Sequence, residues 1–141
     1  VEPGRSLVGE AGVLVSRVIY MKEGGATRFL IIDAGMNDLM RPSLYGAHHD
    51  IVPVRESDTA PQPCDVVGPI CETGDTFLRG FPLPPLQAGD LVAIRDAGAY
   101  GAVMAGTYTP RALVPEVMVR VGNAQLIRRR VPPDELIALD L

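Results

Sequence analysis

The segment 68–75, Gly-Pro-Ile-Cys-Glu-Thr-Gly-Asp, contains a cysteine that directly precedes a glutamate and lies four residues before an aspartate. Cys71 is either a reactive thiol or a small apolar residue at the end of a strand. Carboxylates beside a thiol disfavour its thiolate form, so Glu72 and Asp75 suit a proton-donating thiol better than a nucleophilic one. A cysteine hydrolase also needs a base, and no sequence signal places either histidine of the pair 48–49 in that role.

A second group of candidate binding residues lies in the segment 33–46, Asp-Ala-Gly-Met-Asn-Asp-Leu-Met-Arg-Pro-Ser-Leu-Tyr-Gly. Arg41 and Tyr45 are four residues apart, so one helical turn would point both side chains the same way. A guanidinium fork beside a phenol suits a carboxylate or a phosphate ligand. A surface ion pair would use Arg41 equally well, so the spacing leaves both interpretations open.

Two further segments place polar groups among glycines. In the segment 96–101, Asp-Ala-Gly-Ala-Tyr-Gly, the glycines would let a backbone or a ligand approach closely, and Tyr100 could stack or donate a hydrogen bond. A tyrosine in a tight turn of a β protein explains the same pattern equally well. The segment 2–5, Glu-Pro-Gly-Arg, is by itself only a turn with one cation.

The candidate groups must be positioned by short strands. The sequence predicts such strands because runs of β-branched residues alternate with turns rich in glycine and proline. A proline-rich stretch, 81–86, is expected to be an irregular connection. Short helices are expected at 42–47 and 132–139, where prolines fall within the first turn. The strands are expected at residues 13–23, 29–33, 50–54, 65–70, 91–95, 117–121 and 124–130.

This pattern predicts a mainly β fold, a Greek-key-like antiparallel barrel or sandwich, closed or nearly closed, with short peripheral helices. A chain of 141 residues is long enough for one hydrophobic core. No internal repeat or low-complexity tract divides it. Residues 1–141 are therefore expected to form a single β domain.

The composition excludes several classes of protein. A formal net charge of −4 gives no basic field for nucleic acid, and the cluster Arg128–Arg130 is better explained as a solvated strand end than as a phosphate site. No apolar run approaches the roughly 20 residues that span a bilayer, so no membrane partner and a cytoplasmic location are expected. The two cysteines, with no zinc-like spacing, predict reduced thiols and no metal site.

Taken together in their order along the chain, 2–5, 33–46, 68–75 and 96–101, the four segments make the sequence closely resemble the C-terminal part of the diaminopimelate decarboxylases. These are pyridoxal-phosphate enzymes of the fold-type III family that includes alanine racemase and ornithine decarboxylase. The resemblance runs over nearly all residues, including 115–117 and 126–130. It implies a two-domain subunit with a (β/α)8 barrel, absent from this sequence, that holds pyridoxal phosphate on a Schiff-base lysine. The present sequence would form most of the C-terminal β domain.

The single lysine, Lys22, stands beside a glycine turn and far from the four segments, so it is not expected to be the cofactor lysine. The sequence is therefore expected to be a domain of a longer polypeptide, with residues 1–6 at the junction to the barrel. A domain without the cofactor lysine is expected to be inactive when isolated.

The family's roles apply to this sequence residue by residue. Cys71 would be the catalytic proton donor and would reach, with Glu72, into the active site of a partner subunit across a homodimer interface. Arg41 and Tyr45 would hold a carboxylate of the substrate, and Glu72 its distal ammonium. Substrate binding is thus assigned to Arg5, Arg41, Tyr45, Glu72 and Tyr100, and cofactor binding to Glu2, Pro3, Gly4, Arg5 and Tyr100.

The function that the resemblance implies is a carboxy-lyase reaction, the pyridoxal-phosphate-dependent decarboxylation of meso-diaminopimelate to L-lysine in the last step of lysine biosynthesis. A diamino diacid presents an ammonium and a carboxylate at its far end, and Glu72 with Arg41 supplies a group for each. Two alternatives stay open. One is a related decarboxylase acting on carboxynorspermidine, ornithine or arginine, and the other is a non-catalytic homologue that regulates such an enzyme.

Overall fold

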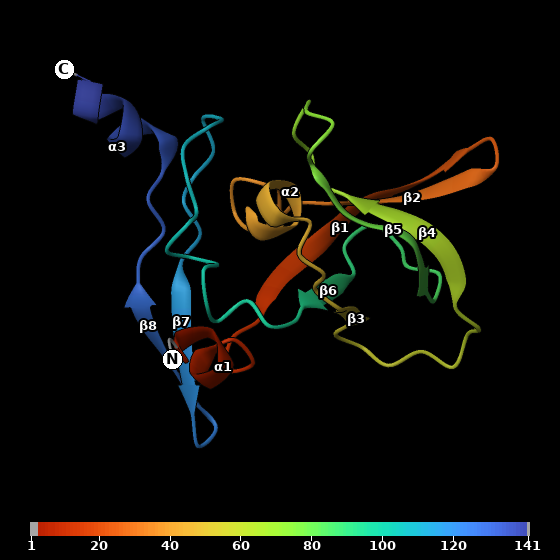
Figure 1. The fold of residues 1–141 in the computed structure, drawn as a ribbon, viewed down its shortest axis with the longest axis horizontal. Coiled ribbons are helices and arrows are strands. Elements are labelled where there is room, and N and C mark those ends of the chain that lie inside the picture. Colours follow the sequence, from red (N-terminus) through yellow and green to blue (C-terminus); the bar gives the residue numbers. More distant parts are fainter. Residues whose placement is uncertain (1–2, 141) are drawn as a thin grey trace.

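Six strands form one curled sheet in the computed structural model, which describes residues 3–140 (Figure 1). The strand order is β3-β6-β1-β2-β4-β5, and the sheet curls into a nearly closed barrel around one core. The predicted mainly β class with few short helices is confirmed. The strands are β1 (Leu14–Gly24), β2 (Thr27–Ile32), β3 (Ile51–Pro53), β4 (Gln62–Val67), β5 (Thr76–Leu83) and β6 (Leu91–Ile94).

The long strand β1 organises the sheet because its two halves have different partners. Residues 14–17 pair with β6, and residues 18–24 pair with β2 in the predicted hairpin. The turn between β1 and β2 contains Gly25 at a φ of 65°, a conformation that glycine adopts without the strain of a side chain. The β-branched run and the glycine pair thus fold together as the sequence predicted.

Two expectations about the sheet were wrong. The sheet was expected to be antiparallel throughout, and residues 81–86 were expected to be irregular. Strands β2 and β4 are parallel, and β5 extends through Pro82 as far as Leu83. Pro82 lies opposite Pro63 on β4, and β5 is an edge strand of the sheet. A proline is tolerated there because an edge strand has a side without ladder hydrogen bonds.

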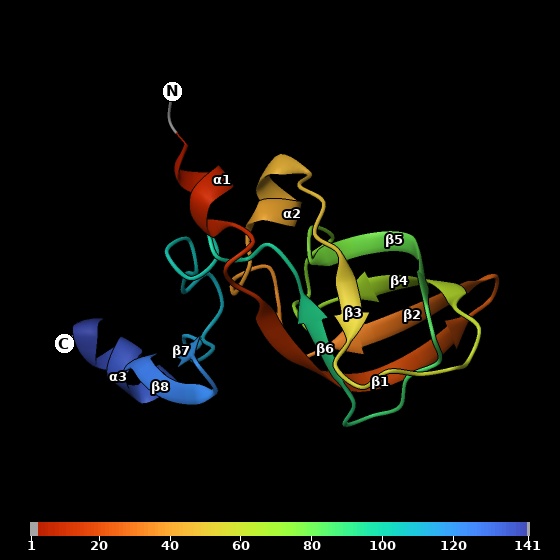
Figure 2. The same cartoon turned by 90° about the horizontal axis from the view of Figure 1, so that it is seen from below.

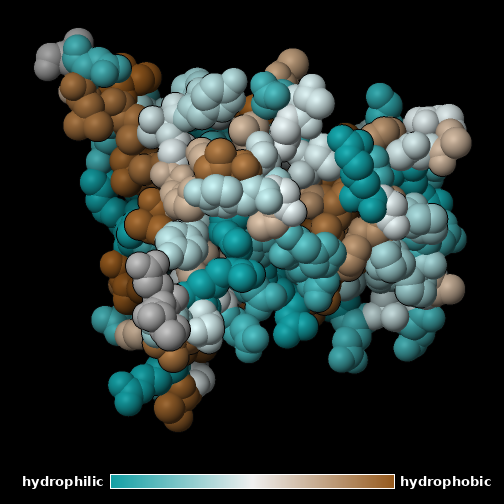
Figure 3. Space-filling view, in the orientation of Figure 1, coloured by the Kyte–Doolittle hydropathy of each residue, from teal (hydrophilic) through white to brown (hydrophobic). Residues whose placement is uncertain are grey.

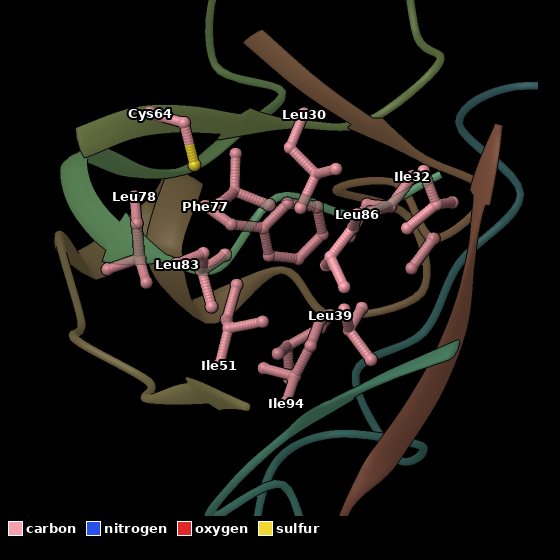
Figure 4. Packing of buried hydrophobic residues seen from close by; sticks show 14 residues of the cluster. Leu30, Ile32, Leu39, Ile51, Cys64, Phe77, Leu78, Leu83, Leu86 and Ile94 are labelled. Carbon is pink, nitrogen blue, oxygen red and sulfur yellow. The ribbon is translucent and has the colours of Figure 1, made fainter. Parts of the chain in front are cut away.

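The core lies inside the curled sheet, where side chains from opposing strands point into a common interior (Figure 4). Leu30, Ile32 and Ile94 are completely buried, and burial of each such side chain stabilises the fold by about 1.5–3 kcal/mol. The thiol of Cys64 belongs to the same cluster, and burial raises its pKa. This cysteine is a core residue.

A second, smaller β element follows the sheet. The hairpin of β7 (Glu116–Arg120) and β8 (Asn123–Arg128) forms a separate two-stranded sheet, and a bridge between Leu113 and Val131 closes its base. The sequence predicted this hairpin with its turn at residues 122–123, but the two positive φ angles lie at Val121 and Gly122. After the hairpin come α3 (Pro133–Ile137), which begins at a proline as predicted, and the 3-10 helix η1 (Ala138–Asp140).

The other two helices are a single turn each. The helix α2 (Arg41–Tyr45) has a proline in its first turn and ends at Gly46, whose φ of 61° stops the helix. The residues of α1 (Gly4–Val8) form a short helix, whereas the sequence predicted only a turn at this end of the chain. Figure 2 shows α1 and α2 projecting from the same side of the molecule. None of the helices within residues 3–140 has the length and apolarity needed to cross a bilayer.

Candidate active site

A buried carboxylate holds the cysteine loop (residues 68–75) against the segment that leads into α2. Asp75 accepts hydrogen bonds from the backbone N–H groups of Met36 and Ile70, each at 2.6 Å. We call this arrangement the Asp75 bridge. Burial raises the pKa of Asp75, while the two N–H donors act in the opposite direction. The sequence predicts a charge beside the Cys71 thiol at this position, whereas in the structure the carboxylate joins two segments.

Glycines allow the cysteine loop to pack this closely. A Cβ on Gly68 would collide with the Asp75 carboxylate. A Cβ on Gly74 would lie 2.6 Å from the Ser43 hydroxyl oxygen on α2, closer than real Cβ contacts permit. The loop and the helix also line one cleft of about 450 Å³. Segments expected from the sequence to do related chemistry are therefore neighbours in space.

Cys71 and Glu72 are both exposed at the surface of the cysteine loop. The Glu72 carboxylate accepts one hydrogen bond within the loop, from the Gly74 N–H at 3.2 Å. Most of its acceptor capacity therefore faces solvent. Since Cys64 lies in the core, Cys71 is the thiol that a substrate can reach.

Arg41 and Tyr45 are the first and last residues of α2, so the predicted helical spacing is confirmed. Tyr45 is exposed and Arg41 is half-buried. Within residues 3–140, Arg41 forms no ion pair with a carboxylate, and its Nη1 contacts the Nε2 of His49 at 3.3 Å. The surface ion pair that the sequence left open is not formed in this part of the chain, so the guanidinium is available to a ligand.

A second group of candidate residues forms where α1 meets the tyrosine loop (residues 96–101). The Gly98 N–H donates to the Gly9 carbonyl at 3.0 Å, and the Ala97 N–H donates to the Gly12 carbonyl at 2.9 Å. A Cβ on Gly98 would collide with the Val8 carbonyl oxygen. Only a glycine permits this close approach, which places the α1 end of the chain against the tyrosine loop.

The side chains of Arg5 on α1 and Tyr100 in the tyrosine loop are exposed. The candidate cofactor residues Pro3 and Gly4 are also exposed at the start of α1, whereas Glu2 lies outside the described residues. Tyr100 lines a cavity of about 450 Å³ that extends toward β7 and β8. A cation and an aromatic ring thus come from two adjoining segments.

The backbone of the tyrosine loop is strained at both ends of the motif. Asp96 has a φ of 59° and Tyr100 a φ of 57°. The left-handed region costs an L-residue other than glycine about 1–2 kcal/mol. Strain of this kind concentrates at functional sites, where the surrounding structure imposes the side-chain direction. Val121 in the β7–β8 turn also has a positive φ, 49°, so the strained backbone is compatible with a turn tyrosine as well as with a binding role for Tyr100.

Lys22 is remote from both groups. It lies on β1 opposite Phe29, near the β1–β2 turn, and Figures 1 and 2 show this turn at the opposite end of the molecule from α1. The residues of this group could help to bind a phosphate-bearing aromatic cofactor, because Arg5 provides a cation for the phosphate and Tyr100 provides an aromatic ring. They do not include a lysine that could bond the cofactor there.

Two buried polar residues of this region were given no role from the sequence. They are Asp38 and His49, which are at most 5% exposed. Asp38 accepts a hydrogen bond from the Gly35 N–H at 2.8 Å, and burial raises its pKa while Arg111 opposes the shift. The only available sequence signal was the density of polar residues between a strand and a short helix, which does not reveal burial.

Comparison with known proteins decides the family. A family model described as "Pyridoxal-dependent decarboxylase, C-terminal sheet domain" matches residues 7–98. The chain belongs to this family. This confirms the family that the sequence resembles. The matched residues include the cysteine loop and α2 but end before Tyr100.

Individual decarboxylases match over nearly the whole chain. A diaminopimelate decarboxylase from Zymomonas mobilis is 52% identical over 96% of this chain and 32% of its own length. The structure of a Helicobacter pylori diaminopimelate decarboxylase complexed with L-lysine has a TM-score of 0.90 at 45% identity, over 96% of this chain and 33% of that chain. A lysine decarboxylase from Selenomonas ruminantium is less similar, with a TM-score of 0.65 at 28% identity over 74% of this chain and 28% of that chain.

These decarboxylases are much longer than the chain. The chain spans about a third of the length of the curated relatives it matches. Family membership therefore identifies this chain as the sheet domain, and it does not by itself establish the activity of a complete decarboxylase.

Proposed function

We propose that the chain acts as the C-terminal β domain of a diaminopimelate decarboxylase, a carboxy-lyase that converts meso-diaminopimelate to L-lysine and CO2. The Asp75 bridge is the observation that carries this proposal. It joins a loop with an exposed thiol and carboxylate to the segment that leads into a helix with a guanidinium and a phenol. Similarity to diaminopimelate decarboxylases along the chain supports the same substrate.

In this proposal the two ends of the substrate are recognised by different charges. Arg41 and Tyr45 bind the carboxylate that is not lost, and Glu72 binds the ammonium next to it. An arginine fork can form two parallel hydrogen bonds to a carboxylate, which adds directional specificity to the charge attraction. Arg5 and Tyr100 complete the substrate and cofactor contacts from the α1 side.

Cys71 supplies the proton that completes the reaction. Pyridoxal phosphate, when bound, delocalises into its ring the electron pair that remains on the α-carbon after CO2 leaves. The Sγ–H of Cys71 then transfers its proton to that carbon, and general acid catalysis of this kind contributes about 10²–10⁴-fold. The exposed position of Cys71 supports this role, because the thiol must reach a carbon held by another part of the enzyme.

The proposed enzyme is a homodimer in which the cysteine loop enters the active site of the second subunit. The cofactor lysine belongs to a barrel domain of the longer polypeptide. A large exposed apolar surface supports further protein partners, because soluble monomers rarely leave contiguous apolar patches uncovered. Apolar side chains gather over β7, β8 and α3 (Figure 3). Both cysteines are free thiols, which agrees with a reducing compartment such as the cytoplasm.

A decarboxylase acting on carboxynorspermidine, ornithine or arginine is the second candidate, and a non-catalytic regulatory homologue is the third. The lower similarity to lysine decarboxylase disfavours a substrate without a second carboxylate. Within the described residues Arg41 has no carboxylate partner, which also favours a diacid. A side-by-side assay of the longer enzyme with meso-diaminopimelate, ornithine and carboxynorspermidine separates these candidates, and turnover of meso-diaminopimelate alone is expected.

Arg41→Ala tests the carboxylate clamp in that enzyme. A hydrogen-bonded charged group contributes about 1.5–3 kcal/mol, so the KM for meso-diaminopimelate should rise by roughly tenfold to a hundredfold. Inhibition by 1,5-diaminopentane, which has no carboxylate, should change less than twofold. Arg79→Ala is the matched control, because Arg79 is an exposed arginine beside Asp65. Equal losses for both ligands would argue against the clamp.

A further inference from the structure

His49 is a buried histidine between the sheet and α2, and the roles above do not use it. It is 2% exposed and lies two residues before the start of β3. Its neighbour His48 is exposed and pairs with Asp50. Burial of an imidazole requires hydrogen-bond partners for both ring nitrogens, because an unpaired polar group in the interior costs about 1–3 kcal/mol.

Both ring nitrogens of His49 have partners. The Nδ1 lies 2.8 Å from the carbonyl oxygen of Arg95, and the Nε2 lies 3.3 Å from the Nη1 of Arg41. A carbonyl oxygen only accepts and a guanidinium only donates. The hydrogen must therefore be on Nδ1, which leaves the Nε2 lone pair to accept from Arg41. A doubly protonated imidazole could not accept this hydrogen bond.

The Arg95 carbonyl is a rigid anchor for this chain of hydrogen bonds. Arg95 directly follows β6, and its N–H donates to the Asp50 carbonyl at 2.8 Å, which extends the pairing of β3 with β6. The imidazole thus links the end of β6 to Arg41, the first residue of α2, through two hydrogen bonds. Arg95 also directly precedes the tyrosine loop, so the same chain relates the Arg41 side chain to the segment that contains Tyr100.

Among residues 3–140, the side-chain hydrogen bond of Arg41 is to His49 and does not use its Nε–Nη2 edge. The edge formed by Nε and Nη2 is the side of a guanidinium that can meet a carboxylate with two parallel hydrogen bonds. The His49 contact occupies Nη1. A neutral acceptor at Nη1 also leaves the positive charge of Arg41 uncompensated, whereas a carboxylate in that place would compete with the ligand.

We propose that His49 is a positioning residue for the proposed substrate, because its neutral Nδ1–H tautomer holds the Arg41 guanidinium with the Nε–Nη2 edge turned to the distal carboxylate. This inference rests on the proposed function for its substrate. The hydrogen-bond chain itself belongs to the present chain and can be tested without turnover.

The tautomer is the first test, on the 141-residue chain itself. Long-range ¹H–¹⁵N correlation spectra of the side chains distinguish the two neutral tautomers of each histidine, and His49→Gln assigns the His49 signals. The expected result is a protonated Nδ1 in the chain at neutral pH. A protonated Nε2 in the neutral ring would overturn the inference, because that nitrogen could not accept from Arg41.

Ligand discrimination is the second test, in the longer decarboxylase that contains this chain. L-lysine retains the carboxylate of the substrate's far end, whereas 1,5-diaminopentane does not. In His49→Leu, inhibition by L-lysine should weaken about tenfold, and inhibition by 1,5-diaminopentane should change less than twofold. His49→Gln, which keeps an acceptor and a donor, should restore most of the L-lysine affinity. His48→Gln, the matched surface control, should match the unmodified enzyme.

The two proposals fail in different ways. Absence of meso-diaminopimelate turnover in the unmodified enzyme would sink the proposed function, while the tautomer measurement would still decide the hydrogen-bond chain. Turnover in the unmodified enzyme with equal losses for both inhibitors in His49→Leu would overturn only the role of His49. Thermal unfolding of each variant with bound cofactor shows whether a loss follows from misfolding, and a rescue by Gln excludes a mere packing effect.

Discussion

The two cysteines have opposite environments, and this difference predicts opposite results of mutation. In the longer decarboxylase, Cys71→Ala should lower kcat by about 10²–10⁴-fold because the proposed proton donor is lost. Cofactor absorbance should persist, since Cys71 is an exposed loop residue and not part of the core. Cys64→Ala, which removes the buried thiol, is the control. It should lower stability while kcat stays within about twofold of the unmodified enzyme.

Steady-state kinetics at saturating substrate, with absorbance spectra of the bound cofactor, measure this contrast. An unchanged kcat in Cys71→Ala would exclude the thiol as the proton donor. A large loss in both variants would mean that the chain tolerates neither substitution, and solvent isotope effects on the remaining turnover would then identify the proton-transfer step.

The buried carboxyl of Asp38 predicts a pH dependence of stability. Burial raises its pKa in the folded chain, whereas the unfolded value is about 3.9. Between these two values the folded state binds more protons than the unfolded state. The free energy of unfolding therefore falls as the pH rises through this window, and it stays lower above it. Protonation of this carboxyl stabilises the fold.

Asp38→Asn should remove this part of the pH dependence, because an amide oxygen can still accept from the Gly35 N–H and has no charge to desolvate. Urea unfolding of the 141-residue chain from about pH 4 to pH 7 measures it. The decline should be shallower in the variant. An identical slope in both chains would show that Asp38 is not desolvated as its burial indicates.

At the level of elements, the Asp75 bridge determines whether the cysteine loop and α2 keep their relative position. Asp75→Asn replaces one acceptor by an NH2 group that faces a backbone N–H of Met36 or Ile70. The free energy of unfolding should fall by about 1–3 kcal/mol. The two amides should exchange with solvent faster, while the core amide of Leu30 keeps its protection relative to global stability.

Hydrogen exchange read by NMR tests this, and Asp58→Asn in an exposed loop is the matched control. The control should leave every amide rate within about twofold. Unchanged exchange at Met36 and Ile70 in Asp75→Asn would mean that the glycine contacts of the loop alone keep the two elements together.

The whole molecule has one well-buried core and one hairpin that is exposed on its outer side. Val119 on β7 is 72% exposed, which is unfavourable for a surface that stays in water. Val119→Lys should change the unfolding free energy of the chain by less than about 0.5 kcal/mol, because exposed positions tolerate substitution.

The same substitution should lower the unfolding temperature of the longer decarboxylase by several degrees if other protein covers the hairpin, as expected for a buried charge without a partner. Calorimetry of both proteins measures the difference. Gln62→Lys on β4 is a control at another exposed site. An unchanged unfolding temperature in the longer enzyme would show that β7 faces solvent there too.

Sequence patterns were sufficient to predict those elements whose formation depends on neighbouring residues in the chain. The β1–β2 hairpin follows from a β-branched run that ends in glycines, and the presence of a short helix follows from Pro42 in its first turn. The predicted helix range 42–47 was wrong at its end, because Gly46 stops the helix after Tyr45. The four motifs in their order identified the family, because a set of residue types at given spacings needs no structure to be recognised. The extension of β5 through Pro82 was missed, since a proline is excluded from a strand only when both sides of that strand are paired.

The tertiary structure alone decided which polar groups meet. Asp75 binds a backbone group 39 positions away, and His49 binds one 46 positions away. No periodicity or local propensity specifies such partners, because they depend on how the sheet curls and on which loops the parallel pairing of β2 and β4 brings together. The residue types predicted a thiol acid, a carboxylate and a cation–phenol pair, and the fold determined that the elements with these groups are held against one another.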